Sequence, residues 1–185
     1  MRVRGSPAKG GAIRGSSTKG GAIRNRARSI RLAVFDVDGV LTDGTLYIGP
    51  SGEAFKAFNI LDGHGVKMLQ SAGVATAILS GRESEAVRRR AAELGIATVV
   101  EGAGDKLAAF EKMITGLGLD ALACAYVGDD LPDLPVMQRC GFAVAVANAV
   151  DAVKSAAHYV TRASGGRGAV REFCDLVLAA RESRG

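Results

Sequence analysis

Cysteines, long apolar segments and, in one region, acidic residues are scarce in this chain of 185 residues. The three cysteines, Cys124, Cys140 and Cys174, are odd in number, and their spacing does not match a metal site. We therefore expect reduced thiols in the core of a cytoplasmic protein. No apolar window is long enough to span a bilayer. No apolar segment near the N-terminus is typical of a secretory signal, so we expect no membrane partner.

Acidic residues are absent from residues 1–31, which carry nine Lys or Arg. The rest of the chain holds 15 basic and all 19 acidic side chains, so the net charge of +5 arises in the N-terminal stretch. The hexapeptide Lys-Gly-Gly-Ala-Ile-Arg occurs there twice, and there is almost nothing to bury. This predicts a disordered basic tail over residues 1–30, a folded domain over 31–181 and a short tail over 182–185. A solvated extension is favoured over nucleic-acid binding, which is the alternative.

One stretch organises the rest of the chain. The apolar run Leu32–Phe35 leads directly into Asp36 and Asp38. A short, uninterrupted apolar run is typical of a strand buried on both faces of a parallel sheet. Ligands bind at the carboxyl ends of such strands. Two carboxylates so close together repel each other unless a proton or a cation intervenes, and Mg²⁺ is the simplest cation to propose. Taken alone, the motif could also be a polar turn.

Further polar clusters follow later apolar runs. Ser80 and Gly81 come after the run 74–79, and a group of aspartates comes after the run 122–127. Lys106 begins a predicted helix near the same edge. Because predicted strands alternate with predicted helices throughout, we expect an α/β fold with a doubly wound, mostly parallel sheet.

The segment 45–58 predicts a β-hairpin, with a turn at 49–52. It carries more apolar residues than an isolated hairpin should expose, so cover must come from the same domain or from another subunit. A helix is expected at 66–71, with Asp62 as its N-cap.

The ordered set of motifs resembles the haloacid dehalogenase-like phosphohydrolase superfamily. The matching pieces, within residues 31 to about 181, are Asp36-Val-Asp-Gly-Val-Leu-Thr-Asp43, Ser80, Lys106 and Gly128-Asp-Asp-Leu-Pro-Asp133. A closer resemblance is to the 3-deoxy-D-manno-octulosonate 8-phosphate phosphatases. It is carried by Phe58-Asn-Ile-Leu-Asp-Gly-His-Gly65, Leu79-Ser-Gly-Arg82 and Gly165-Gly-Arg-Gly-Ala-Val-Arg-Glu172, with one departure at Leu61, where some members have a polar or basic residue.

The resemblance implies a Rossmann-like core without a cap domain, a homotetramer and a role in lipopolysaccharide synthesis. The implied reaction is Mg²⁺-dependent hydrolysis of a sugar-acid phosphate. Asp36 would be the nucleophile, forming an aspartyl-phosphate, and Asp38 the general acid and base. Asp36, Asp129 and the backbone carbonyl of Asp38 would hold the metal. Ser80, Gly81 and Lys106 would bind the phosphate, while Asp130 and Asp133 would orient Lys106 or metal-bound water.

A sugar acid carries a carboxylate besides its phosphate, so basic residues near the site are substrate-binding candidates. They are Lys56, His64, Lys67, Arg82 and Arg167. The alternative for each of them is a solvated surface charge. Three other functions stay open: a phosphatase for another nonulosonate or sugar phosphate, a non-catalytic tetramerisation module, and a nucleic-acid-binding protein acting through the basic tail.

Overall fold

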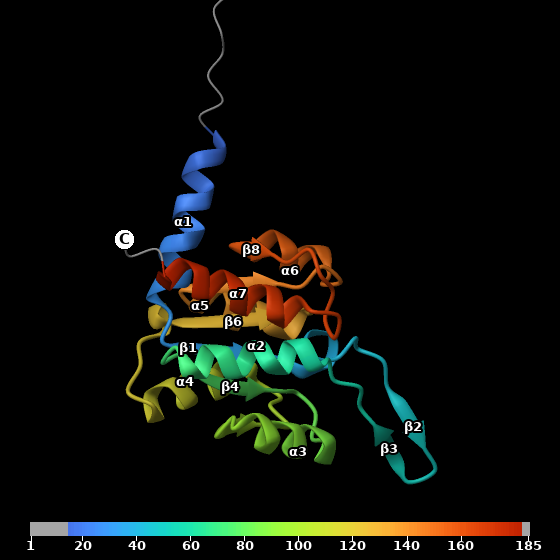
Figure 1. Ribbon diagram of the computed structural model, residues 1–185. Coiled ribbons are helices and arrows are strands. Elements are labelled where there is room, and N and C mark those ends of the chain that lie inside the picture. Colours follow the sequence, from blue (N-terminus) through green and yellow to red (C-terminus); the bar gives the residue numbers. More distant parts are fainter. Residues whose placement is uncertain (1–14, 183–185) are drawn as a thin grey trace, which may run out of the picture.

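The computed structural model describes residues 15–182, and a six-stranded parallel sheet forms its centre (Figure 1). The strand order is β5-β4-β1-β6-β7-β8. The bounds are β1 Leu32–Phe35, β4 Ala75–Leu79, β5 Thr98–Val100, β6 Cys124–Gly128, β7 Phe142–Ala145 and β8 Tyr159–Val160. Every residue of β1, β6 and β7 is buried, which is why these strands are continuous apolar runs. This arrangement confirms the predicted fold class.

Helices cover both faces of the sheet. The helices α2 (Ile60–Ser71) and α7 (Ala169–Glu182) lie side by side over one face, as Figure 1 shows, and α1 (Gly15–Ser29) packs on α7. The remaining helices are α3 (Glu85–Leu94), α4 (Lys106–Gly116), α5 (Leu134–Arg139) and α6 (Asp151–Ala156). Of these, α5 contacts both α4 and α6. No helix in the described part of the chain is long and apolar enough to cross a membrane.

The predicted hairpin consists of β2 (Tyr47–Gly49) and β3 (Gly52–Phe55), which pair antiparallel and project from the body (Figure 1). The rings of Tyr47 and Phe55 stack with their centroids 4.3 Å apart. Ile48 and Phe55 are nevertheless exposed. Within the described residues, only a turn, this hairpin and α2 separate β1 from β4, so there is no cap domain there.

The predicted disordered tail is wrong where the structure describes it. Residues 15–29 form α1, and Ala27 is fully buried. Ile23, Ala27 and Ile30 are spaced as one face of a helix, and that face lies against the core. Arg26 Nη1 adds a hydrogen bond to the carbonyl oxygen of Gly141, 2.6 Å away. Residues 1–14 and 183–185 lie outside the described residues, and so does the prediction for them.

The sequence predicted Asp62 as the N-cap of α2, and this prediction is wrong. The helix begins at Ile60, and Asn59 caps it by accepting hydrogen bonds from the backbone N–H groups of residues 61 and 62. Asp62 is buried and accepts hydrogen bonds from the backbone N–H groups of Gly168, at 3.2 Å, and Arg171, at 2.7 Å. It therefore joins α2 to the start of α7.

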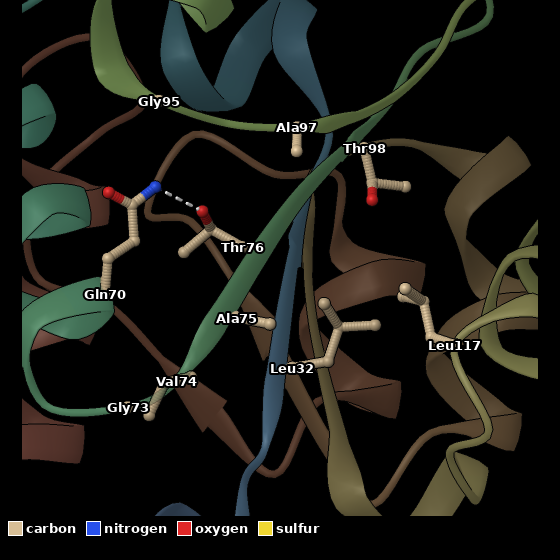
Figure 2. A pocket seen from close by; sticks show the side chains of 10 residues that line it. All are labelled: Leu32, Gln70, Gly73, Val74, Ala75, Thr76, Gly95, Ala97, Thr98 and Leu117. Atoms are coloured by element: carbon tan, nitrogen blue, oxygen red, sulfur yellow. Dashed lines mark hydrogen bonds between the residues drawn. The ribbon is translucent and has the colours of Figure 1, made fainter.

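A cavity of about 530 Å³ lies at the amino ends of β1, β4 and β5 (Figure 2). Its lining residues are Leu32, Gln70, Gly73, Val74, Ala75, Thr76, Gly95, Ala97, Thr98 and Leu117, and none of them is charged. Figure 2 shows one hydrogen bond among them, donated by Gln70 Nε2 to Thr76 Oγ1 over 2.7 Å. All the predicted catalytic residues lie at the opposite edge of the sheet.

Candidate active site

Asp36 and Asp38 leave β1 in a turn that directs both side chains into a cleft. Asp36 is extended and donates its backbone N–H to the carbonyl oxygen of Val127 on β6. A tight turn over Val37–Leu41 follows, whose backbone is not helical at Asp38 and Gly39, and Gly39 adopts a φ of 92° in it. A Cβ atom on Gly39 would lie 2.0 Å from Oδ2 of Asp129, so glycine is required for the two loops to meet.

The cleft has a volume of about 320 Å³ and lies at the carboxyl ends of β1, β4 and β6. Its lining residues are Asp36, Asp38, Ser80, Gly81, Arg82, Ala103, Gly104, Lys106, Asp129, Asp130, Pro132 and Asp133. Every predicted nucleophilic, acid-base, phosphate-binding and metal-binding residue is among them. The sheet therefore brings together side chains from four separate motifs.

Lys106 forms the centre of the charged cluster. Its Nζ lies 2.8 Å from Oδ1 of Asp36 and 2.7 Å from Oδ1 of Asp133, and the side chain is buried. Burial lowers the pKa of Lys106, but the charges of these two carboxylates outweigh it and the pKa is raised. The ammonium group therefore stays charged in a site that would otherwise be dominated by carboxylates.

Asp133 uses both carboxylate oxygens to hold the cluster in place. Oδ1 accepts hydrogen bonds from Lys106 and from the hydroxyl of Tyr126, each over 2.7 Å. Oδ2 accepts from the backbone N–H groups of Asp129, at 2.9 Å, and Asp130, at 3.1 Å. With both oxygens engaged, Asp133 orients Lys106. The exposed Asp130 side chain instead accepts a hydrogen bond from the next backbone N–H and caps the turn.

The metal prediction named Asp36, Asp129 and the backbone carbonyl of Asp38. Carboxylate oxygens of Asp36, Asp129 and Asp133 all lie within 4.8 Å of one another. Oδ1 of Asp129 is buried and has no hydrogen-bond partner. Burial first, and then the charges of Asp36 and Asp133, raise the pKa of Asp129. A divalent cation would relieve this repulsion, and the residues fit it. Because the oxygens of Asp133 already accept hydrogen bonds, Asp36 and Asp129 are the side chains available to it.

Ser80 directly follows β4 and is buried at the cleft wall. Its Oγ accepts a hydrogen bond from the backbone N–H of Arg82 over 3.2 Å. The backbone carbonyl of Ser80 accepts another from Ala103, which fixes the loop to the neighbouring one. The helix that follows, α3, begins at Glu85, and Ser84 is its N-cap.

The five substrate-binding candidates separate into two groups. Arg82 lines the cleft, and its Nε lies 3.7 Å from Oδ2 of Asp38. The side chain of Lys56 is enclosed between two carboxylates. His64 and Lys67 are exposed on α2, and Arg167 is exposed, with Nη2 3.4 Å from Oδ2 of Asp43. Of the five candidates, Arg82 alone is among the residues that line the cleft, and Lys56 reaches it only through its ion pair with Asp38.

With this geometry established, comparison with known proteins places the chain in a family. The sequence model of a family described as haloacid dehalogenase-like hydrolase matches residues 96–173. A 3-deoxy-D-manno-octulosonate 8-phosphate phosphatase from Yersinia pestis is 47% identical over 157 residues, which are 85% of this chain and 84% of that protein. The chain belongs to the haloacid dehalogenase-like phosphatases.

Solved structures of these phosphatases have the same fold. A probable YrbI family phosphatase from Pseudomonas syringae superposes with a TM-score of 0.86 at 52% identity, covering 89% of this chain and 93% of that one. A 3-deoxy-D-manno-octulosonate 8-phosphate phosphatase from Moraxella catarrhalis, solved with a magnesium ion, a phosphate ion and KDO, has a TM-score of 0.84 at 42% identity. The superposition covers 86% of this chain and 92% of the Moraxella chain. The family predicted from the motifs is therefore confirmed.

Two supporting residues of this phosphatase fold escaped the sequence analysis. Tyr126 is buried on β6, where burial and the charge of Asp133 raise the pKa of its hydroxyl well above the ordinary value. Asn148 donates from Nδ2 to the carbonyl oxygen of Gly39 over 3.0 Å and accepts at Oδ1 from the N–H of Gly165 over 2.6 Å. Nothing in the sequence marks either residue, because each contact joins segments that are brought together only by the fold.

Proposed function

We propose that the chain hydrolyses 3-deoxy-D-manno-octulosonate 8-phosphate to the free sugar acid and inorganic phosphate, with Mg²⁺, and thereby serves lipopolysaccharide synthesis. The observation that carries the proposal is the cluster of Asp36, Lys106 and Asp133 beside Asp38 and the partnerless oxygen of Asp129. The names of the relatives support the substrate, since the Yersinia protein is a phosphatase for this compound. The Moraxella structure also contains magnesium, phosphate and the product sugar acid.

The arrangement supports a two-step reaction. An oxygen of Asp36 attacks phosphorus, and the bond from phosphorus to the ester oxygen breaks, leaving an aspartyl-phosphate. Asp38 donates a proton to the leaving oxygen and then accepts one from the water that hydrolyses the aspartyl-phosphate. Lys106 and Ser80 hold the non-bridging phosphate oxygens as charge develops on them. Asp36, Asp129 and the backbone carbonyl of Asp38 would hold Mg²⁺, which when bound would supply positive charge to offset the phosphate dianion.

Lys106 also favours the ionised form of the nucleophile. Burial and the charge of Asp133 raise the pKa of Asp36, and the ammonium group opposes this shift through an ion pair and a hydrogen bond. At the cleft mouth, the half-exposed Arg82 offers a guanidinium to the carboxylate of a sugar acid. His64, Lys67 and Arg167 remain candidates for substrate contact that would need a second subunit to bring them to a cleft.

We also propose a cytoplasmic homotetramer. The exposed apolar residues around the hairpin support self-association; they are Leu46, Ile48, Phe55, Ile60 and Leu61. The three cysteines are buried and free, which suits a reducing compartment. The complete acid, base and lysine set argues against a non-catalytic assembly module.

Phosphate release from a panel of sugar-acid phosphates, with and without Mg²⁺, tests the proposed function. We expect 3-deoxy-D-manno-octulosonate 8-phosphate to give the highest kcat/KM in the panel, and no turnover after chelation. A preference for a nonulosonate phosphate would replace the substrate and keep the chemistry. No hydrolysis of any phosphate monoester with Mg²⁺ would overturn the proposal.

A further inference from the structure

Lys56 directly follows β3, and its side chain turns inward beneath the hairpin. The side chain is only 2% exposed, whereas the preceding Phe55 is 56% exposed, as expected for neighbours on an extended chain. Nζ lies 2.5 Å from Oδ1 of Asp38 and 3.0 Å from Oε2 of Glu53. A buried ammonium group is stable only when it is paired in this way. The ammonium group of Lys56 is therefore already paired with carboxylates of this chain and is not free to bind a substrate.

Glu53 anchors Lys56 to the body of the molecule. Oε1 of Glu53 accepts a hydrogen bond from the hydroxyl of Ser84, which caps α3. Burial raises the pKa of Glu53, but the hydrogen bonds from Ser84 and Lys56 outweigh it and the pKa is lowered. The chain of contacts thus runs from α3 through Glu53 and Lys56 to Asp38. It links the base of the hairpin to the cleft.

The two oxygens of Asp38 have different surroundings. Oδ1 is held by Lys56, while Oδ2 is 3.7 Å from Nε of Arg82, which is beyond hydrogen-bond distance. We propose that Lys56 is a positioning residue that fixes the carboxyl group of Asp38 through Oδ1 and leaves Oδ2 to exchange the proton. This inference rests on the proposed function, and it assigns to Lys56 a role other than substrate binding.

The proposed proton path is balanced over the two steps. As the bond from Asp36 to phosphorus forms and the ester bond breaks, the proton on Oδ2 of Asp38 passes to the leaving alkoxide oxygen. When water then attacks phosphorus, one of its protons passes to Oδ2, and the bond from Asp36 to phosphorus breaks. A mispositioned Asp38 always slows the second step, in which water must lose a proton. It slows the first step only when the leaving group needs a proton.

Leaving-group dependence separates positioning from a general structural defect. We expect Lys56→Met to lower kcat for an alkyl phosphate, the sugar-acid phosphate, about ten- to a hundredfold with little change in KM. With p-nitrophenyl phosphate, whose phenolate leaves without a proton, the first turnover should keep its wild-type rate. Because the second step is slowed, rapid mixing should then show a burst of about one nitrophenolate per active site.

Three further variants make the result interpretable. Asp38→Asn should show the same leaving-group dependence, and the exposed Lys112→Met should behave as wild type with both substrates. Glu53→Gln, which keeps the lysine but weakens its anchor, should give a smaller effect of the same kind, and it serves if Lys56→Met does not fold.

Equal losses with both substrates and no burst would overturn the positioning role. A raised KM with unchanged kcat would overturn it as well, because Lys56 would then bind the substrate. A wild-type protein that hydrolyses neither substrate would instead contradict the proposed function.

Discussion

The two edges of the parallel sheet, where its strands begin and where they end, carry cavities of opposite character. At the carboxyl end, a cleft of about 320 Å³ contains carboxylates, a lysine and an arginine; at the amino end, a cavity of about 530 Å³ contains no charged side chain (Figure 2). The smaller cavity is the candidate active site. Asp36 and Leu32, four residues apart on one segment, line the two different cavities. Volume alone therefore does not locate the chemistry in this fold.

Backbone polarity explains the difference. Each parallel strand leads at its carboxyl end towards the N-terminus of a helix, where free N–H groups and the positive end of the dipole favour anions. At the amino-end cavity, the nearby helices end rather than begin. Its lining residues Gly73, Gly95 and Leu117 each come one or two residues after the C-terminus of a helix. A phosphate ester would meet carbonyl oxygens there. The comparison predicts that substitutions at the carboxyl end change catalysis and substitutions at the amino end change stability.

The largest expected effect is that of Asp36→Asn at the carboxyl end. Loss of the nucleophile should lower kcat by about three orders of magnitude or more, while the circular dichroism spectrum stays that of the wild type. Steady-state phosphate release on a purified sample measures it. Activity within about tenfold of wild type would contradict the assignment of Asp36.

Removing the metal should abolish turnover. It should also lower the Tm, because the carboxylates of the cluster then repel one another. Exhaustive chelation is expected to stop catalysis, Mg²⁺ to restore it, and Ca²⁺ to inhibit because of its looser coordination. Mg²⁺ should also raise the Tm of the wild type.

Asp129→Asn provides the matching control for the metal. Without any metal, this variant should have a higher Tm than the wild type, because one buried carboxylate has been removed from the cluster. Its Tm should then respond little to Mg²⁺. An equal response in both proteins would mean that the cation binds elsewhere.

Truncation at the N-terminus tests the part of the tail prediction that the structure overturned. Removing residues 1–29 takes away the buried Ala27, the partly buried Ile23 and the hydrogen bond from Arg26 to Gly141. We expect the free energy of unfolding to fall by about 1–3 kcal/mol, with kcat per folded molecule unchanged. Urea denaturation measures the loss, and deletion of residues 1–14 alone is the control. Identical unfolding curves for both truncations would contradict the packing of α1.

The smallest effect is expected at the amino-end cavity. Gln70→Leu removes the hydrogen bond to the buried Thr76 and should cost about 1 kcal/mol of stability, with kcat and KM within about twofold of wild type. Urea denaturation and steady-state kinetics on the same preparation test both parts. A large loss of kcat would show that the two ends of the sheet are coupled.

The sequence predicted the central strands well, because strands buried on both faces are short apolar runs bounded by polar residues. The motif residues of the cleft followed from the same rule, since all of them stand at strand or helix ends. Helix α1 escaped prediction because its apolar stripe of three residues is diluted by glycine and arginine. The start of α2 escaped because Gly63 and Gly65 suggest a loop, whereas they let side chains of Arg90, Arg171 and Cys174 approach the helix closely.

Contacts between distant segments were beyond sequence reasoning. The hydrogen bond from the Tyr126 hydroxyl to Asp133 depends on how β6 faces the turn that follows it. Lys56 was predicted to be a substrate-binding residue, whereas the structure pairs it with Asp38 and Glu53. A lysine beside a hairpin has no pattern that distinguishes a buried ion pair from a solvated charge.

The catalytic turn is completed from the far end of the chain. Asn148 holds the carbonyl oxygen of Gly39, and a Cβ atom on Gly165 would lie 1.7 Å from that same oxygen. On the ribosome, the two aspartates of this turn emerge more than a hundred residues before Asn148. A nascent chain therefore carries its nucleophile long before it can hold it in place. Phosphatase activity should appear only after Asn148 and Gly165 have been synthesised, and translation products truncated before them should be inactive.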